Sequence, residues 1–537
     1  MSVIHSDLDV YSSDFARNRE AMQQAIDAMR AIQQKVMDKS FDAKAKFAKR
    51  GKLLPHERIE HLLDAGSPFL DLQGLIGYQM YDDKDGSDAG GGVISGIGMV
   101  QGVRCLINAS NSAIKGGTMS PMGVHKTLRL QEIALENKLP VITLTESGGA
   151  NLNYASEVFV LGGRTFANQA RLSAAGIPQI SVVHGNATAG GAYQPALSDY
   201  LIVVRKQTEM FLAGPPLLRA ATGEIANSED LGGAEMHAQT AGTAEFLAEN
   251  DADGIRIARE VLSMLNWREQ TASSPTDYAE PRYPIDELLG LIPADTKQPF
   301  DMREVIARLV DDSDFMAFKA EYDSLTVCGW AKIGGFVVGI ITNNGPITPQ
   351  GATKAAQFIQ LCEQTQRPLL FLHNTTGFMV GTDAEQQGIV KHGAKLIQAV
   401  ANATVAKLSI VVGGSYGAGN YAMCGRGLSP RFIFAWPNAR TAVMGGAQAG
   451  KVLRIVTEDK QRAAGMTPDP QVLDFLEQST ALKLDQQCGA LFNTARGHDD
   501  GLIDPRDSRR VLIMLLQTIH EANARRPNTS SFGVARL

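Results

Sequence analysis

The 537-residue chain is poor in cysteine, in charge and in long apolar runs. Its five cysteines show no CxxC or CxxxC spacing, so neither a zinc or other metal site nor a disulfide framework is expected. The net charge is -6 without a long basic run, which argues against a nucleic-acid partner. No run of about 18 apolar residues and no signal-peptide pattern occurs, so the sequence predicts a cytoplasmic protein with no membrane partner.

Side chains with strong acid or base chemistry are also scarce around the glycine motifs. Residues 414–417 place a serine among glycines but lack the GxSxG spacing of a hydrolase. No carboxylate pair accompanies these motifs, as a hydratase would require. His125, His373 and His392 are weak catalytic candidates, because none has an acidic residue nearby to orient it. We therefore expect the proton acceptor to belong to a cofactor.

The dominant positive feature is a repeat. Residues 147–149 and 188–193 form the first copy, and residues 376–378 and 415–421 form the second. The two segments are 43 residues apart in the first copy, counted from Ser147 to Gly190. They are 42 residues apart in the second copy, counted from Thr376 to Ala418. A repeat of about 200 residues is too long for a solenoid unit and predicts two homologous domains.

Strands and helices alternate along both halves, which indicates an α/β (α+β) fold. The polar, aperiodic stretch 270–283 predicts a linker, and we place the domains at residues 1–276 and 277–537. An amphipathic helical arm is expected from about Asp14 to Arg50. The polar loop 82–88 is expected to be a solvated turn.

Paired small residues follow a β-rich run in both halves. Gly190-Gly191 and Ala418-Gly419 each precede a helical stretch, so their N–H groups suit an oxygen that gains negative charge. Close helix packing would explain a single Gly-Gly pair, but the recurrence favours two oxyanion holes.

The chain resembles the carboxyltransferase β subunit of biotin-dependent acyl-CoA carboxylases of the methylcrotonyl-CoA and geranyl-CoA branch. The matching segments include SGGANL, TAGGAYQPALSD, FLAGPPLLRAATGE, FDMREVIARLVD, TTGFMVG, KHGAKL, GGSYGAGNYAMCGR and WPNAR. The resemblance covers nearly the whole chain. It implies tandem crotonase-like ββα-spiral domains, with acyl-CoA held by the N-terminal domain and carboxybiotin by the C-terminal domain of a neighbouring protomer.

The resemblance also implies roles for individual residues. Gly190 and Gly191 would hold the thioester enolate oxygen, and Ala418 and Gly419 the ureido oxygen of biotin. Further substrate-binding candidates are Gly148, Gly149, Gly162 and Lys115, and further carboxybiotin-binding candidates are Thr376, Gly377, Phe378 and Tyr416. The ammonium of Lys115 would meet a CoA phosphate, or alternatively it is a solvated surface group.

A partner subunit is expected because two sequences are missing. The chain has no biotin-attachment segment of the Ala-Met-Lys-Met type and no ATP-binding glycine loop with its lysine. The resemblance implies an α subunit with biotin carboxylase and biotin carrier domains, which uses ATP and bicarbonate and carries carboxybiotin covalently. It further implies a homo-oligomeric β core in an α6β6 complex.

Departures from the methylcrotonyl pattern bear on the substrate. The loop after SGGANL is short, and Gly162 stands where methylcrotonyl enzymes have a bulky Phe. Residues 345–348 lack a typical Phe, and residues 445–447 read Gly-Gly-Ala in place of Gly-Gly-Glu. We therefore favour geranyl-CoA, carboxylated at its γ-carbon, over 3-methylcrotonyl-CoA. Loop shortening alone would also explain Gly162. Hypotheses of another kind are a non-catalytic scaffold subunit and a carboxyltransferase of a decarboxylase.

Overall fold

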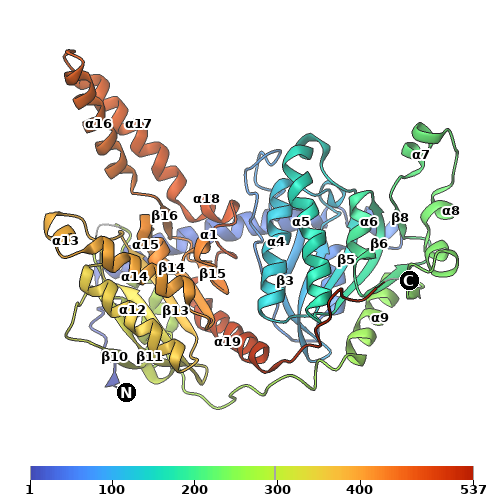
Figure 1. The fold of residues 1–537 in the computed structure, drawn as a ribbon, viewed down its shortest axis with the longest axis horizontal. Coiled ribbons are helices and arrows are strands. Elements are labelled where there is room, and N and C mark those ends of the chain that lie inside the picture. The colour runs from blue at the N-terminus through green and yellow to red at the C-terminus, as the bar shows by residue number, and fades with distance from the viewer. Residues whose placement is uncertain (1, 296–297, 536–537) are drawn as a thin grey trace. The chain divides into compact units, whose positions relative to one another are not determined.

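The computed structural model describes residues 2–295 and 298–535, which divide into two compact units. The unit that we call the C-unit comprises Met1–Arg30, Pro275–Thr494 and His498–Leu516. The N-unit comprises Ala31–Ser274, Ala495–Gly497 and Gln517–Leu537. Figure 1 shows a sheet with packed helices in each unit. Our division at residues 276 and 277, as a statement about independently folding domains, stays a prediction.

The N-unit is built on an eight-stranded sheet. Its path is β2 (Leu70–Asp71), β3 (Val93–Val100), β4 (Val103–Ser110), β5 (Val141–Ser147), β6 (Gln179–Thr188), β7 (Tyr200–Val204) and β9 (Phe246–Ala248), with β8 (Glu209–Phe211) beside β6. Strands β2 to β4 run antiparallel and β4 to β7 run parallel. The connecting helices include α4 (Pro121–Glu136), α5 (Ala155–Ala174) and α9 (Asp251–Met264). Parallel strands require such crossover helices, so the glycine turns fall at the carboxyl ends of β5 and β6.

The C-unit repeats this arrangement. Its path is β1 (Ser2–Val3), β10 (Asp314–Phe318), β11 (Thr326–Ile333), β12 (Phe336–Asn343), β13 (Leu369–Thr375), β14 (Lys407–Tyr416) and β15 (Phe432–Ala435), with β16 (Arg440–Ala442) beside β14. Helices α12 (Pro349–Gln364) and α14 (Ile389–Asn402) occupy the places of α4 and α5. The predicted duplication of a mixed α/β fold is confirmed.

The repeat extends to single hydrogen bonds at the domain entrances. The Asp64 carboxylate accepts the N–H groups of Gln101 and Gly102 in the β3–β4 turn, at 2.9 and 2.8 Å. Asp311 accepts the corresponding N–H groups of the β11–β12 turn at 2.8 Å each. Burial tends to raise the pKa of Asp64, but these amides and Arg259 lower it overall. The entrances of the two repeated units therefore make the same contacts.

The register of the repeat differs by one residue from our sequence alignment. The Ser147 hydroxyl donates to the Gly117 carbonyl at 3.1 Å and accepts the Gly149 N–H at 3.1 Å. The Thr375 hydroxyl makes the same two bonds, to the Gly345 carbonyl at 3.1 Å and from the Gly377 N–H at 3.2 Å. Ser147 thus corresponds to Thr375 and not to Thr376, and 43 residues separate turn and glycine segment in both copies.

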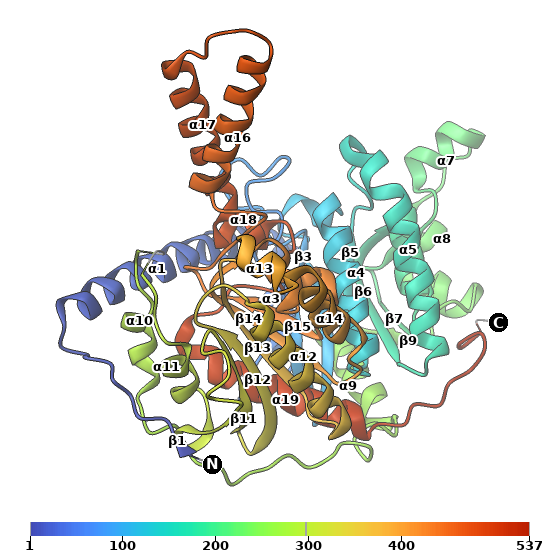
Figure 2. The ribbon, with the colours of Figure 1, turned by 60° about the vertical axis from the view of Figure 1, so that its left-hand side comes forward.

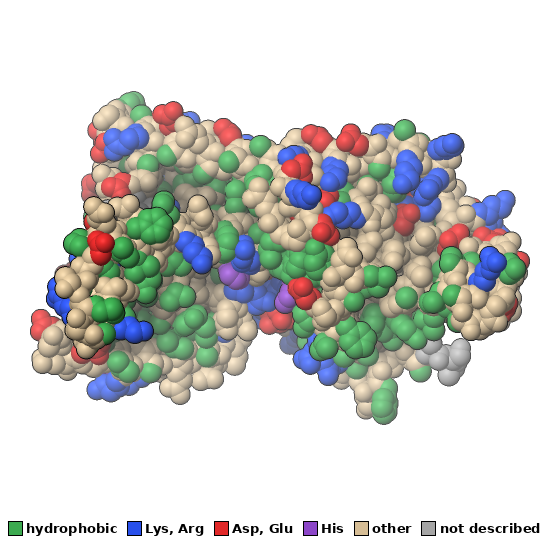
Figure 3. All heavy atoms as spheres, turned by 90° about the horizontal axis from the view of Figure 1, so that it is seen from above, with side chains coloured by type: hydrophobic (Ala, Val, Ile, Leu, Met, Phe, Trp, Pro, Cys, Tyr) green, Lys and Arg blue, Asp and Glu red, His purple; other side chains and the backbone are tan. Residues whose placement is uncertain are grey.

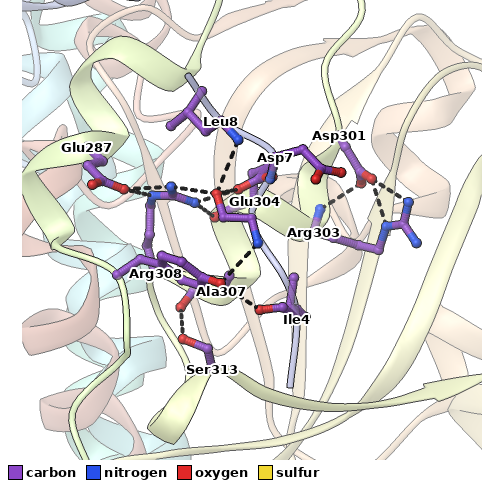
Figure 4. Close-up of polar contacts among 12 residues, drawn as sticks. Ile4, Asp7, Leu8, Glu287, Asp301, Arg303, Glu304, Ala307, Arg308 and Ser313 are labelled. Carbon is purple, nitrogen blue, oxygen red and sulfur yellow. Dashed lines mark hydrogen bonds and ion pairs between the residues drawn. The ribbon is translucent and has the colours of Figure 1, made fainter. Parts of the chain in front are cut away.

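The N-terminal arm is two helices, α1 (Ser13–Phe41) and α2 (Lys44–Lys49), where one was expected. The residues before α1 pack against the rest of the C-unit, as Figure 4 shows. Glu304 accepts the Ser6 hydroxyl at 2.6 Å and the Asp7 N–H at 2.9 Å, and the buried Arg308 guanidinium bridges Glu304 and Glu287. The first strand, β1, pairs with β10.

A helical hairpin extends from the C-unit (Figures 1 and 2). It consists of α16 (Gly446–Ala463) and α17 (Pro470–Cys488), and several of its apolar side chains are exposed, Phe475 among them. Figure 3 shows apolar side chains gathered on this face of the C-unit, with charged side chains at their margin. Within the described parts of the chain, we find no helix with the length and apolar character needed to cross a bilayer.

Candidate functional site

The N-unit contains a cavity of about 930 Å³. It lies between the sheet strands β4 to β6 and the helices α4 and α5. Five of the predicted site residues line it, namely Gly148, Gly149, Gly162, Gly190 and Gly191. Most other lining side chains are apolar, including Leu106, Leu130, Val141, Phe166 and Leu172. No Asp, Glu, His, Lys or Arg side chain is among the described residues that line it. This cavity therefore offers apolar surface to a ligand but no protein acid or base.

The mouth of the cavity is formed where β6 turns into α6 (Gly190–Ala196). Ala189 has φ 53° and ψ −125°, which reverses the chain just before the helix. The Ala192 N–H bonds to the Ala189 carbonyl at 3.0 Å, whereas the N–H groups of Gly190 and Gly191 lie in the first turn, where a helix leaves donors without intrahelical acceptors. A Cβ on Gly191 would lie 3.7 Å from the Ser147 hydroxyl oxygen, so both predicted glycine turns meet at this mouth.

Gly162 lies within α5 and lines the same cavity. A Cβ built on Gly162 has no atom within 4 Å, and the same holds for Gly163. The helix continues through both glycines, so neither is required by a positive φ. A side chain at position 162 could therefore start into the cavity without a close contact at its Cβ.

Lys115 lies outside the large cavity. It lines a neighbouring pocket of about 190 Å³, and its ammonium is 2.8 Å from the Asp88 carboxylate. The loop 82–88 beside it was predicted to be a solvated turn. Asp82, Lys84 and Asp85 are exposed, but Asp83, Gly86 and Ser87 are buried. Asp83 is 6% exposed, because its carboxylate accepts the N–H groups of Gln79, Gly86 and Asp88 and folds the loop around itself.

The C-unit holds a smaller pocket, of about 490 Å³. Thr376 and Tyr416 line it, together with backbone of β14 and of the segment after α10 (Leu288–Leu291). Burial raises the pKa of the Tyr416 hydroxyl. Next to these residues, α15 (Gly417–Ala422) begins at Gly417, whose φ of 53° equals that of Ala189 before α6. Ala418 therefore takes the place of Gly190.

The remaining carboxybiotin candidates take different positions. A Cβ on Gly419 would lie 2.8 Å from the Cα atom of Gly377, so this close approach of two loops requires glycine. The Phe378 side chain turns toward α14 and lies against Gly393. Gly377 and Gly419 are therefore adjacent in the fold, whereas Phe378 packs on the helix layer.

A buried Ser–His pair in the C-unit was not predicted. The Ser415 hydroxyl lies 2.9 Å from His373 Nδ1 and accepts from the Asn420 amide at 2.8 Å. Both side chains are fully buried, and burial lowers the pKa of His373 to about 3. No substrate can reach Ser415, so the pair is structural.

A second unpredicted group is an ionic network under the N-unit turn. The Glu146 carboxylate, one residue before Ser147, bonds Lys52 at 2.7 Å and Arg58 at 2.8 Å. Arg58 also bonds Asp251, whose carboxylate accepts a hydrogen bond from His184 Nδ1 at 2.8 Å. Burial raises the pKa of Asp251, but His184 and Arg58 lower it to about 2. The network holds the end of β5 against α3 (Pro55–Leu62) and α9.

Among the residues that the structure describes, no group of three or more His, Cys, Asp or Glu side chains could hold a metal ion. All five cysteines are buried and unpaired.

Comparison with known proteins decides the family. Residues 46–532 match the sequence profile of the carboxyl transferase domain family. The chain belongs to this family. It is similar over 100% of its length to the solved β subunit of geranyl-CoA carboxylase from P. aeruginosa, covering 100% of that chain with 64% identity and a TM-score of 0.94.

Curated relatives of this carboxyltransferase are β chains of a related enzyme. The probable mitochondrial methylcrotonoyl-CoA carboxylase β chain of Drosophila melanogaster is 44% identical over 100% of this chain and 95% of its own. The corresponding chain of Dictyostelium discoideum is 48% identical over 91% of this chain and 83% of its own. The predicted carboxyltransferase component of a biotin-dependent acyl-CoA carboxylase, in the geranyl-CoA and methylcrotonyl-CoA branch, is confirmed. The roles of single residues stay predictions.

Proposed function

We propose that this chain transfers CO2 from carboxybiotin to the γ-carbon of geranyl-CoA. The observation that carries the proposal is the cavity of about 930 Å³ with Gly162 at its wall and open space beyond it. An acyl group of five carbons leaves much of this apolar space unfilled, whereas burial of a longer hydrocarbon chain is favourable. The 64% identity to the P. aeruginosa geranyl-CoA carboxylase β subunit points the same way.

The N-unit would bind and polarise the thioester. The N–H groups of Gly190 and Gly191 donate to the thioester oxygen as it gains negative charge, and the start of α6 adds partial positive charge. One such donor is typically worth about 10²–10³ in rate. Ser147 fixes the neighbouring Gly149 and Gly117 loops through its two hydrogen bonds.

The C-unit fits a ureido ring. Its pocket of about 490 Å³ lies beside the first turn of α15, where the Ala418 and Gly419 N–H groups would donate to the ureido oxygen. Thr376 and Tyr416 would position the ring, and Gly377 allows the loops to approach. Carboxybiotin, when bound, supplies the CO2 and takes up the substrate proton, which suits a cavity without an acidic or basic side chain.

The complex would include a second kind of subunit. We infer an α subunit that carries biotin covalently and charges it with ATP and bicarbonate, assembled with this chain as α6β6. Lys115, which is 45% exposed and paired with Asp88, would be available to a CoA phosphate at the entrance. 3-Methylcrotonyl-CoA is the second candidate substrate, because curated relatives carry that name.

The test is a comparison of acyl-CoA substrates with the complex purified together with its α subunit. ATP- and bicarbonate-dependent carboxylation is measured with geranyl-CoA, 3-methylcrotonyl-CoA and propionyl-CoA. The proposal expects the highest kcat/KM with geranyl-CoA. A higher value with 3-methylcrotonyl-CoA would return that substrate to first place, and no carboxylation of any of the three would refute a catalytic role.

A further inference from the structure

The proposed oxyanion hole of the N-unit has different neighbours beside its two glycines. Apart from the adjoining residues and the helix backbone, the atoms nearest to a Cβ on Gly191 are the Ser147 hydroxyl oxygen and backbone atoms of Gly149, at 3.7 to 3.9 Å. A Cβ on Gly190 has one such atom within 4 Å, the Cζ atom of Phe166 at 3.9 Å. The hole is therefore flanked by a glycine turn and by an aromatic ring.

The Phe166 ring approaches the hole with its tip. Cζ is the ring atom farthest from the backbone, and no other atom of the ring comes within 4 Å of the Cβ position on Gly190. In a helix, the Cα–Cβ bonds tilt toward the N-terminus, and the free N–H groups of the first turn point the same way. The ring tip and the Gly190 N–H therefore face the same space in front of α6.

Packing holds the ring in this orientation. Phe166 lies one turn after Gly162 on α5, is only partly buried and lines the acyl cavity. Its ring makes an edge-to-face contact with Tyr193, with 6.0 Å between the ring centroids and an interplanar angle of 64°. Aromatic pairs prefer this arrangement. Tyr193 follows Gly190 on α6, so the helix that supplies the N–H donors also carries the residue that holds the ring.

The other side chain beside the hole has no hydrogen to offer. The Ser147 hydroxyl donates to the Gly117 carbonyl at 3.1 Å and accepts the Gly149 N–H. No Lys, Arg or His side chain is among the described residues that line the cavity. The edge of an aromatic ring carries positive partial charge, which acts more strongly in an apolar cavity than in water. Of these two neighbouring side chains, Phe166 is therefore the one that presents positive charge to an oxyanion.

The internal repeat provides a reference for this position. Ser147 and Thr375 make the same hydrogen bonds in the two units. The C-caps of α5 and α14, which are Ala175 and Ala403, follow them at the same distance in sequence. The two helices can therefore be compared residue by residue.

The comparison shows that the fold does not require an aromatic residue here. Phe166 corresponds to Ala394 in α14. Tyr193 corresponds to Tyr421, and these two side chains are 47% and 49% exposed. Phe378, which packs on this helix layer of the C-unit, comes from the loop after β13 and not from α14. An aromatic residue at this helix position is thus present at the hole proposed for the thioester and absent at the hole proposed for the ureido oxygen.

We propose that Phe166 is a catalytic residue, because the positive edge of its ring stabilises the enolate oxygen held by the Gly190 and Gly191 N–H groups. The inference rests on the proposed function and adds a side chain to its oxyanion hole. Loss of the γ-proton to biotin places negative charge on the thioester oxygen, and bond formation between the γ-carbon and CO2 moves that charge to the new carboxylate. The ring therefore acts more strongly on the transition state than on the bound substrate.

The experiment replaces Phe166 by 4-fluorophenylalanine in the complex of the full-length chain with its α subunit. Fluorine puts negative partial charge at the ring tip, whereas the shape of the ring changes little. We expect kcat for geranyl-CoA to fall about two- to tenfold, the range of one aromatic interaction. The affinity for geranyl-CoA, measured by calorimetry, should stay within about twofold, because the bound thioester oxygen carries little charge. A residue needed only for packing would not show this separation of kcat from affinity.

Two further proteins complete the test. Phe166→Leu removes the ring edge and should also lower kcat more than affinity, which keeps the inference testable if the fluorinated protein does not fold. 4-Fluorophenylalanine in place of Phe246, which is exposed on β9 and does not line the cavity, is the matched control and should leave kcat unchanged. An unchanged kcat after fluorination of Phe166, or a loss confined to affinity, would overturn the inference. Absence of geranyl-CoA carboxylation by the unmodified protein would instead refute the proposed function.

Discussion

Gly162→Phe should make the enzyme selective for short acyl chains. The substitution should be tolerated by the backbone, because Gly162 lies in the regular helix α5 and a Cβ there meets no atom within 4 Å. Phe has a higher helix propensity than Gly by about 0.3–0.5 kcal/mol, so the folded state is not expected to lose stability. The effect therefore has to arise in the cavity that Gly162 lines.

The size of the effect follows from the volume that the ring displaces. A benzyl group would take the place of several acyl carbons, and one methylene in an apolar pocket is worth about 1–3 kcal/mol of discrimination. Partial relaxation of the exposed Phe159 and Val160 at the cavity wall would return part of this. We expect the ratio of kcat/KM for geranyl-CoA over 3-methylcrotonyl-CoA to fall at least roughly tenfold.

The assay is initial-rate carboxylation with both substrates, using the complex with the α subunit. Ala170→Phe is the matched control, because Ala170 is exposed on the same helix and does not line the cavity. That variant should keep the unmodified ratio. Equal losses on both substrates would indicate general disruption, and an unchanged ratio in Gly162→Phe would show that the acyl chain does not pass Gly162.

Three other outcomes are expected. The chain without a partner should bind acyl-CoA in calorimetry but incorporate no labelled bicarbonate until a biotinylated α subunit is added; ATP-dependent carboxylation by the chain alone would contradict this. Ala418→Pro removes one N–H in the first turn of α15, where proline is sterically tolerated, and should abolish transfer while acyl-CoA affinity stays within about twofold; normal transfer by the folded variant would exclude Ala418 from binding the ureido oxygen. Asp251 has a pKa of about 2 in the folded chain, against 3.8 for the free side chain. Its ionised carboxylate should therefore add about 2 kcal/mol to the free energy of unfolding above pH 4, and this contribution should be lost as the pH falls toward 2. Urea unfolding across that range should show this loss, and Asp251→Asn should show a smaller pH dependence.

The sequence revealed those parts of the site that depend on backbone conformation. Gly419 has to be glycine because a Cβ there would lie 2.8 Å from the Cα atom of Gly377, and a position of this kind can be recognised from its residue type. The register of the repeat was wrong by one residue because Thr375 and Thr376 are adjacent and either can be aligned with Ser147. Only the hydrogen bonds to Gly345 and Gly377 distinguish the two threonines.

The parts that the sequence did not reveal are those built from side chains far apart in the chain. The carboxylate of Glu146 meets Lys52 and Arg58 across 94 and 88 residues, and no fixed spacing announces such a network. Phe166 was missed for another reason. An apolar residue in a helix is normally taken to belong to the core, and only the packing of α5 shows that this ring lines an internal cavity beside Gly190.

Strand β1 can pair with β10 only late in the synthesis of the chain. Ser2 and Val3 pair with Phe315 and Asp314, and Ser6 binds Glu304, so these three residues have no partner until some three hundred further residues have been synthesised. At a synthesis rate of about 5–20 residues per second, that delay is roughly 15–60 s. For this period the amphipathic helix α1 is attached to an unpaired leading segment, while the N-unit strands are already available to assemble. A bulky fusion placed ahead of Ser2 would thus disturb the sheet of the C-unit, although most of that unit is synthesised after the N-unit strands.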